Sequence, residues 1–181
     1  MLRFDETSGE CLVFTYKEGL LSAIAHDLEV RVTRFVIEVD EVGRAVDARF
    51  AADSLRVVRA LREGQETALR PGDSDQIEEN IRRDVLEPDR HPDIRFHSSR
   101  VEERSGGYVV TGTLEIRGTT RPLELRVDRE GDRWVSEVRL HQPDFGIKPY
   151  SAMLGALRVK ADVLVRVVVS TGARARVPGD R

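Results

Sequence analysis

The chain has 181 residues, of which 40% are hydrophobic and 34% are charged, and its formal net charge is −3. This length and composition are typical of one globular domain rather than of a disordered or membrane-spanning protein. The small negative charge gives no reason to expect a nucleic-acid partner. Cys11 is the only cysteine, so no internal disulfide can form.

The N-terminal segment carries Asp5, Glu6 and Glu10, where a secretion signal would have a basic start and an apolar core. The best apolar run near it, residues 20–25, is much shorter than the ~20 residues of a membrane span. We therefore expect a cytoplasmic protein with no stable membrane insertion.

Alternating apolar and polar residues predict strands through the first 50 residues. Residues 11–17 form the first, with Phe14 and Tyr16 expected on its inner side. In residues 28–39 the apolar positions change from even numbers to odd numbers after Val32. Such a change of register indicates a β-bulge, which bends a sheet toward closure. Residues 46–50 predict a further strand.

Residues 53–75 fit neither a helical nor a strand period, and we expect a loop with little fixed structure. A helix capped by Asp73 or Ser74 is predicted from Gln76 or Ile77 to Leu86, because apolar residues recur there at helical spacing. Pro88 ends it, since proline lacks an N–H and clashes with the preceding turn.

Alternation returns after Pro88, over about 93–98, 108–117, 122–128, 134–141 and 162–167. Seven or eight short strands with glycine or proline turns indicate a mainly β fold with an antiparallel sheet, which can close into a barrel and so remove its edges. We expect the short helix to cover one end of this barrel. The domain spans residues 1–170, and residues 171–181 are expected to be a disordered tail.

Several motifs, in their order and spacing, resemble the YceI-like family. Arg83-Asp84 lies in the predicted helix, residues 92–98 read Pro-Asp-Ile-Arg-Phe-His-Ser, and residues 111–118 read Thr-Gly-Thr-Leu-Glu-Ile-Arg-Gly. Residues 144–147 and 157–169 are similar to the family's closing strands. The resemblance implies a single extended, lipocalin-like barrel whose apolar channel holds a long lipid chain, typically a polyisoprenoid.

The apolar inner side chains are the main candidates for ligand binding. Any barrel core needs an apolar interior, so periodicity alone leaves plain core and ligand lining both open. The resemblance favours a role in ligand binding for these residues, which are Phe14, Tyr16, Leu28, Val30, Phe35, Ile37, Phe50, Ile94, Phe96, Leu114, Ile116, Leu123, Leu125, Trp134, Phe145 and Val165.

Two polar residues could contact a ligand head group. His26 precedes Asp27 at the start of a strand, and a histidine beside a carboxylate can act as a base or as a hydrogen-bonding contact. A purely structural hydrogen bond is the favoured alternative, because neighbouring strand residues point to opposite sides and Asp27 need not contact His26. Arg117 could bind an anionic group, since arginine binds phosphate bidentately.

The remaining motifs predict no cofactor. The four histidines lack the spacing of metal ligands, and no glycine-rich phosphate-binding loop or nucleophile elbow is present. We therefore assign no catalytic residue and no metal site.

These observations predict a non-catalytic protein that binds or carries a long-chain lipid, a polyisoprenoid or similar, in the barrel interior, and that could form a homodimer. Two alternatives remain open. One is an enzyme acting on a small hydrophobic substrate, with His26 as acid or base and Asp27 or Asp84 orienting it. The other is a filled barrel that acts as an interaction module.

Overall fold

The computed structural model describes residues 1–18, 26–42, 44–152, 154 and 156–170. The predicted tail, residues 171–181, and the apolar run at residues 20–25 lie outside these ranges. Within them, no helix is long and apolar enough to cross a bilayer.

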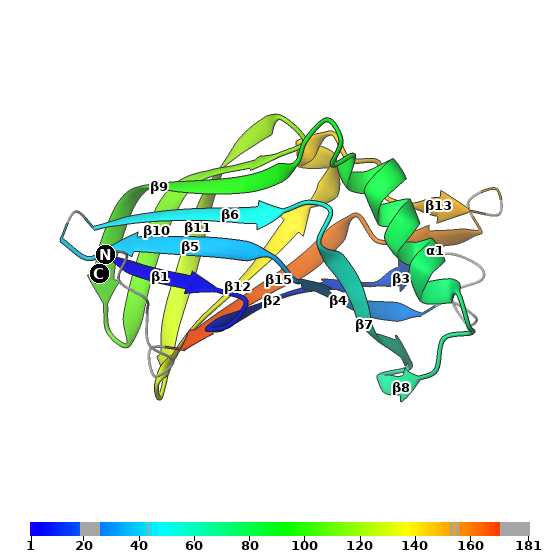
Figure 1. Cartoon of the computed structure of the whole chain (residues 1–181), viewed down its shortest axis with the longest axis horizontal. Helices are drawn as coiled ribbons and strands as arrows, with labels where there is room; N and C mark the ends of the chain where they lie inside the picture. The colour runs from blue at the N-terminus through cyan, green and yellow to red at the C-terminus, as the bar shows by residue number, and fades with distance from the viewer. Residues whose placement is uncertain (19–25, 43, 153, 155, 171–181) are drawn as a thin grey trace, which may run out of the picture.

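Twelve strands form one antiparallel sheet in the order β1-β5-β6-β9-β10-β11-β12-β15-β2-β4-β7-β8. Figure 1 shows that the sheet curls, with β5, β6 and β9 in front of β11, β12 and β15. The strands are β1 (Leu2–Asp5), β2 (Gly9–Thr15), β4 (Asp27–Val32), β5 (Phe35–Asp40), β6 (Ala45–Ala51), β7 (Leu55–Arg62), β8 (Gln65–Thr67), β9 (Asp93–Arg104), β10 (Gly107–Ile116), β11 (Thr119–Glu130), β12 (Arg133–His141) and β15 (Asp162–Ser170).

The mainly β, antiparallel architecture is confirmed, but the expected closed barrel of about eight strands is wrong. The sheet has twelve strands, and its hydrogen-bonded order begins at β1 and ends at β8 without joining them. The physical reason is that the chain changes strand neighbours twice. β4 lies between β2 and β7, whereas its continuation β5 lies between β1 and β6.

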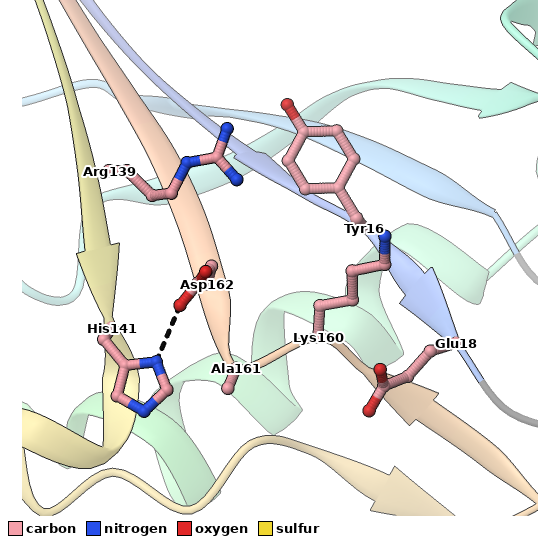
Figure 2. Close-up of a pocket in the computed structure, with 7 residues that line it drawn as sticks. All are labelled: Tyr16, Glu18, Arg139, His141, Lys160, Ala161 and Asp162. Atoms are coloured by element: carbon pink, nitrogen blue, oxygen red, sulfur yellow. Dashed lines mark hydrogen bonds and ion pairs between the residues drawn. The ribbon is translucent and has the colours of Figure 1, made fainter.

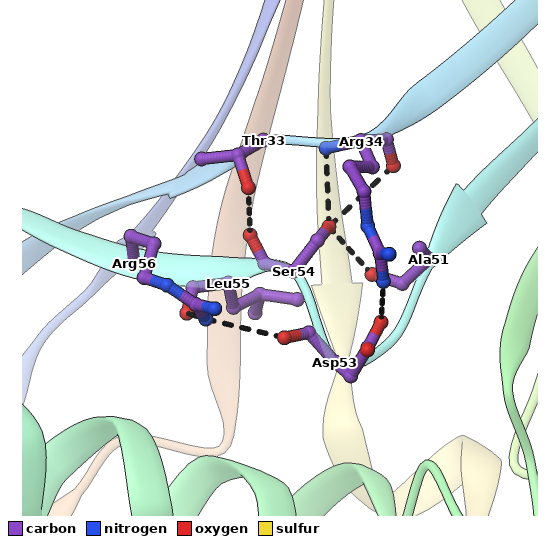
Figure 3. A network of polar contacts seen from close by, with 7 residues as sticks. All are labelled: Thr33, Arg34, Ala51, Asp53, Ser54, Leu55 and Arg56. Carbon is purple, nitrogen blue, oxygen red and sulfur yellow. Dashed lines mark hydrogen bonds and ion pairs between the residues drawn. The ribbon is translucent and has the colours of Figure 1, made fainter.

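Both changes of neighbour occur at one corner of the sheet, shown in Figure 3. Ser54 holds this corner and is only 2% exposed. Its hydroxyl donates to the Ala51 carbonyl at 2.7 Å and accepts from the Arg34 N–H at 3.2 Å. The Thr33 N–H donates to the Ser54 carbonyl at 2.9 Å. One buried side chain therefore joins the β4–β5 bend to the β6–β7 bend.

The β-bulge predicted after Val32 is wrong, because β4 ends at Val32 and β5 begins at Phe35 with different neighbours. The change of apolar register comes from this bend. Val32 and Phe35 are each 4% exposed, although two residues separate them. Arg34 and Asp53 form an ion pair across the corner, and the hydrogen bond from Arg34 holds the pKa of the Asp53 carboxyl below its usual range.

The predicted helix is present as α1 (Asp73–Asn80) followed by a π-helical segment, η1 (Ile81–Leu86). Its predicted cap is wrong, because the N-cap is Gly72 and Asp73 is already helical. The helix ends where predicted, because Glu87 takes a left-handed conformation with φ 48° just before Pro88. Leu86 is buried, and Val85 packs against the core. Figure 1 places α1 across one end of the sheet, and Glu78 fixes it there by accepting the Val57 N–H at 2.9 Å.

The expectation of an unstructured loop over residues 53–75 is wrong, because β7 and β8 form a hairpin there. Its alternation is interrupted by a bulge: Arg59 pairs with Glu29 and Val57 with Val30, so Val58 is an extra residue. Val58 is accordingly 39% exposed. This inserted residue is the reason why neither period fitted the segment.

A second, three-stranded sheet lies at the same end of the molecule as α1 (Figure 1). Its order is β13 (Ser151–Ala152), β14 (Leu157–Val159) and β3 (Lys17–Glu18). A 3-10 helix, η2 (Gln142–Phe145), connects β12 to this region, and Phe145 from it enters the core.

Candidate functional site

Six of the predicted ligand-binding residues form part of the fully buried core of the large sheet. Their exposed fractions lie between 1% and 7%, and they come from strands β4, β5, β9 and β10 and from η2. These residues are Val30, Phe35, Phe96, Leu114, Ile116 and Phe145. Their side chains are covered mainly by one another and by neighbouring core residues.

Seven others pack against this core but are only partly buried. We call them the partly buried lining: Leu28, Ile37, Phe50, Ile94, Leu123, Leu125 and Val165. They come from strands on the two facing sides of the curled sheet, β5, β6 and β9 in front and β11 and β15 behind, together with β4 (Figure 1). Apolar surface that other side chains do not cover is therefore present on the core-facing side of these strands.

Phe14 and Tyr16 lie outside the core cluster, so the predicted inner side of β2 is wrong. Cys11 is buried in the core and Val13 packs against it, which leaves the even-numbered residues on the opposite side of β2. Leu12 on that side is also only 8% exposed. Because β2 is apolar on both sides, its alternation could not decide which side faces the core.

Trp134 also lies outside the core cluster. Its ring packs against Tyr108, with ring centroids 5.4 Å apart, and the guanidinium carbon of Arg129 lies 5.7 Å from the Trp134 centroid. The three residues join β10, β11 and β12 near the hairpin that connects β11 to β12.

His26 lies beside β4 in a setting that disfavours its charged form. Burial, followed by the positive charges of Arg62 and Lys17, lowers the pKa of His26. Asp27 accepts the Lys17 N–H at 2.8 Å. The other carboxylate considered as an orienting group, Asp84, is bound by Arg83 at 2.9 Å. Both carboxylates are therefore engaged with groups other than His26.

Arg117 lies in the tight turn between β10 and β11, where Arg117 and Gly118 have φ values of 51° and 70°. Its guanidinium pairs with Glu87, the residue that ends the helix. This contact joins the turn to the helix end across 30 residues of sequence. A head group would therefore compete with Glu87 for Arg117.

A pocket of about 350 Å³ lies between the start of β2 and the bend that joins β4 to β5. Buried Val32 and Phe35 contribute to its lining from the core. Its rim includes Arg31 and Glu10, whose side chains form an ion pair at 2.6 Å. The pocket therefore lies over buried core residues and has charged side chains beside it.

A larger pocket, of about 530 Å³, lies on the outer side of β2, β12 and β15 (Figure 2). Tyr16 lines it, together with Arg139, His141 and Lys160. Alternation in the sequence could not reveal this pocket, because strands that are distant in the chain bring these residues together. Across the described ranges, no three His, Cys, Asp or Glu side chains are grouped as metal ligands would be.

The apolar interior and the strand order do not by themselves identify the protein family. A match to a known domain family identifies it. The family model of the YceI-like domain matches residues 7–171. This chain belongs to the YceI-like family. The predicted membership is thereby confirmed over most of the sequence.

One curated protein sequence and two solved structures are similar to this chain at low sequence identity. The UPF0312 protein plu2095 of Photorhabdus laumondii is 28% identical over 95 residues, which are 47% of this chain and 48% of that protein. The aligned region thus spans about half the length of this curated relative. BcnA of Burkholderia cenocepacia superposes with a TM-score of 0.59 at 13% identity, over 92% of this chain and 99% of BcnA.

A second solved structure is described as a polyisoprenoid binding domain from Saccharophagus degradans, implicated in plant cell wall breakdown. It matches with a TM-score of 0.57 and 13% identity, over 89% of this chain and 91% of that domain. At this identity the similarity establishes a shared fold.

The motifs that resemble the YceI-like family have structural roles in this chain. Ser98 is 6% exposed, and its hydroxyl accepts the Val46 N–H at 2.7 Å, which joins β9 to the start of β6. Gly112 lies at a close approach of β9 and β10. A Cβ atom there would be 2.3 Å from the His97 carbonyl oxygen.

Proposed function

We propose that this YceI-like protein binds a long apolar chain, a polyisoprenoid or a similar lipid, in the interior of its large sheet and catalyses no reaction. The observation that carries the proposal is the partly buried lining, which leaves apolar surface uncovered on the core-facing side of several strands. Covering such surface with hydrocarbon is favourable. The polyisoprenoid binding domain with the same fold supports this class of ligand.

The energetics favour a long chain over a short one. Each buried CH₂ group contributes about 0.8 kcal/mol, so a five-carbon unit contributes up to about 4 kcal/mol. Association costs about 4–15 kcal/mol in lost translational and rotational freedom. Several units must therefore be buried before binding is strong, which suits an extended ligand lying along the sheet.

The chemistry of the interior supports binding rather than catalysis. The side chains of the partly buried lining are hydrocarbon only. Cys11 lies in the same core, and burial raises its thiol pKa to about 12, which keeps it protonated and unreactive near neutral pH. The polar groups that could act on a substrate, such as His26, lie outside the core cluster.

A second candidate, the filled sheet acting as an interaction module, is favoured by the six predicted residues that are 1–7% exposed. In this alternative the interior side chains pack only against one another. The protein would then act through its outer surface, and added lipid would not bind.

Leu125 and Arg126 on β11 provide a matched test. Leu125 belongs to the lining, whereas the next residue, Arg126, is exposed on the other side of the strand. Leu125→Gln should weaken uptake of a fluorescent polyprenol analogue at least tenfold, because it places an unpaired amide against the ligand. Arg126→Gln should leave uptake unchanged.

Leu123→Gln provides a second lining variant, and circular dichroism shows whether each variant folds. Folded lining variants that bind the analogue as tightly as Arg126→Gln would contradict the proposed site. Wild-type protein that binds no analogue would favour the interaction module. The cytoplasmic location and the homodimer stay predictions from the sequence.

A further inference from the structure

The outer pocket of about 530 Å³ is separate from the apolar interior and has a different chemistry. The alternation of side chains between the two sides of each strand explains this separation. Leu140 and Val165 pack against the core, so Arg139, His141 and Asp162 point to the other side of β12 and β15. Tyr16 follows β2 on its outer side and closes the pocket. We call these residues, together with Glu18 and Lys160, the outer pocket (Figure 2).

The carboxylates of the outer pocket are already engaged. Asp162 contacts Nδ1 of His141 at 2.6 Å. Glu18 lies 3.9 Å from Arg158, its partner across the β3–β14 pair. Neither acid forms an ion pair with the other two cationic side chains of the pocket, Arg139 and Lys160.

Arg139 and Lys160 supply positive charge that no carboxylate of the described residues pairs within 4 Å. Arg139 extends over the pocket beside the Tyr16 ring, and the Lys160 side chain lies against the same ring (Figure 2). The Lys160 ammonium is 6.0 Å from the Tyr16 centroid. Two cations without an ion-pair partner among the described carboxylates and one phenol therefore line the same pocket.

The backbone that carries these groups is firmly held. The Lys160 N–H donates to the Tyr16 carbonyl at 2.7 Å. Gln142 is only 8% exposed and binds two backbone carbonyls of this segment. Its side chain donates to the Lys160 carbonyl at 3.1 Å, and its backbone N–H donates to the Ala161 carbonyl at 2.9 Å. Arg139 lies within the continuous β12–β15 ladder. The backbone therefore needs little ordering when a ligand arrives, which favours binding.

We propose that the outer pocket binds an oxyanion of the phosphate monoester class. A guanidinium presents paired N–H donors that match phosphate oxygens, an ammonium supplies a point charge, and a phenol donates one further hydrogen bond. The groups of Arg139, Lys160 and Tyr16 fit these three roles. Binding in the outer pocket does not require a lipid in the interior, so this site and the proposed lipid-binding function can fail separately.

The test is a heteronuclear NMR titration of the full chain with inorganic phosphate, with sodium chloride at matched ionic strength as reference. Phosphate should give saturable shifts at Tyr16, Arg139 and residues 160–162. Arg139→Gln and Lys160→Gln should each weaken binding about tenfold or more, because each removes a charge-assisted contact. Arg49→Gln removes an exposed arginine from β6, four strands away from β12, and should have no effect.

Two further probes separate the sources of the oxyanion. Glycerol phosphate represents a soluble monoester, and vesicles of phosphatidylcholine with phosphatidic acid represent a lipid head group. Binding of either probe that depends on Arg139 supports the site and identifies the source. Shifts that sodium chloride reproduces, or equal losses in Arg49→Gln and Arg139→Gln, would overturn the proposal, whatever the result of polyprenol uptake.

Discussion

Gly112 illustrates how one residue limits what the sheet can accommodate. It lies at a register shift between β9 and β10, where a Cβ atom would be 2.3 Å from the His97 carbonyl oxygen and 2.8 Å from the Phe96 ring. Contacts this short force the backbone or the buried ring to move. The sequence motif around Gly112 indicated a strand, but only the structure shows why glycine stands there.

Gly112→Ala should therefore destabilise the protein by about 1–3 kcal/mol through overpacking. The free energy of unfolding in urea measures the effect. Thr113→Ala is the control, because Thr113 is the next residue of β10 and is exposed. Equal stabilities of the two variants, within about 0.5 kcal/mol, would show that the close approach has no energetic consequence.

Cys11 should react slowly with a thiol reagent until the protein unfolds. Burial, and secondarily Glu10, raises its thiol pKa from 9.0 to about 12. The unfolded chain therefore loses its thiol proton at a lower pH than the folded chain. The free energy of unfolding keeps the contribution of the protonated Cys11 thiol below pH 9 and loses it as the pH rises toward 12. Reaction with a chromogenic disulfide at pH 8, with and without denaturant, measures the difference. Equal rates would contradict the burial of Cys11.

At the scale of elements, sequence periodicity located those strands and helices whose apolar residues keep one period. The helix from Asp73 to Leu86 is an example, because its apolar side packs on the core and Glu87 ends it before Pro88. Periodicity failed in a strand that contains a bulge and in a strand that is apolar on both sides. Val58 interrupts β7, and β2 has buried side chains on both sides, Cys11 on one and Leu12 on the other.

Ser54 tests whether the corner between the bent strands stabilises the fold. Ser54→Ala should cost about 1–3 kcal/mol, because it leaves the partly buried Arg34 N–H without the hydroxyl acceptor. Thermal or urea unfolding measures the change. Ser105→Ala, in the exposed turn between β9 and β10, is the matched control and should remain within about 0.5 kcal/mol of wild type. If both variants unfold alike, the corner hydrogen bonds do not contribute.

For the whole molecule, the sequence sufficed for the family and for a mainly β fold, because short motifs and alternation are local signals. It did not suffice for the closure of the sheet. That property depends on which strands become neighbours, and β4 and β5 belong to one stretch of chain yet have different neighbours. The outer pocket has the same origin, because Tyr16, Arg139 and Lys160 are brought together from three distant segments.

The central claim is that hydrocarbon surface in the interior accepts a long apolar chain. Native mass spectrometry of freshly purified protein, followed by organic extraction, tests it most directly. Wild-type protein and Arg126→Gln should retain one equivalent of a long-chain lipid or take up added polyprenol, and Leu125→Gln should not. Folded wild-type protein that carries no lipid and takes up no polyprenol would contradict the account.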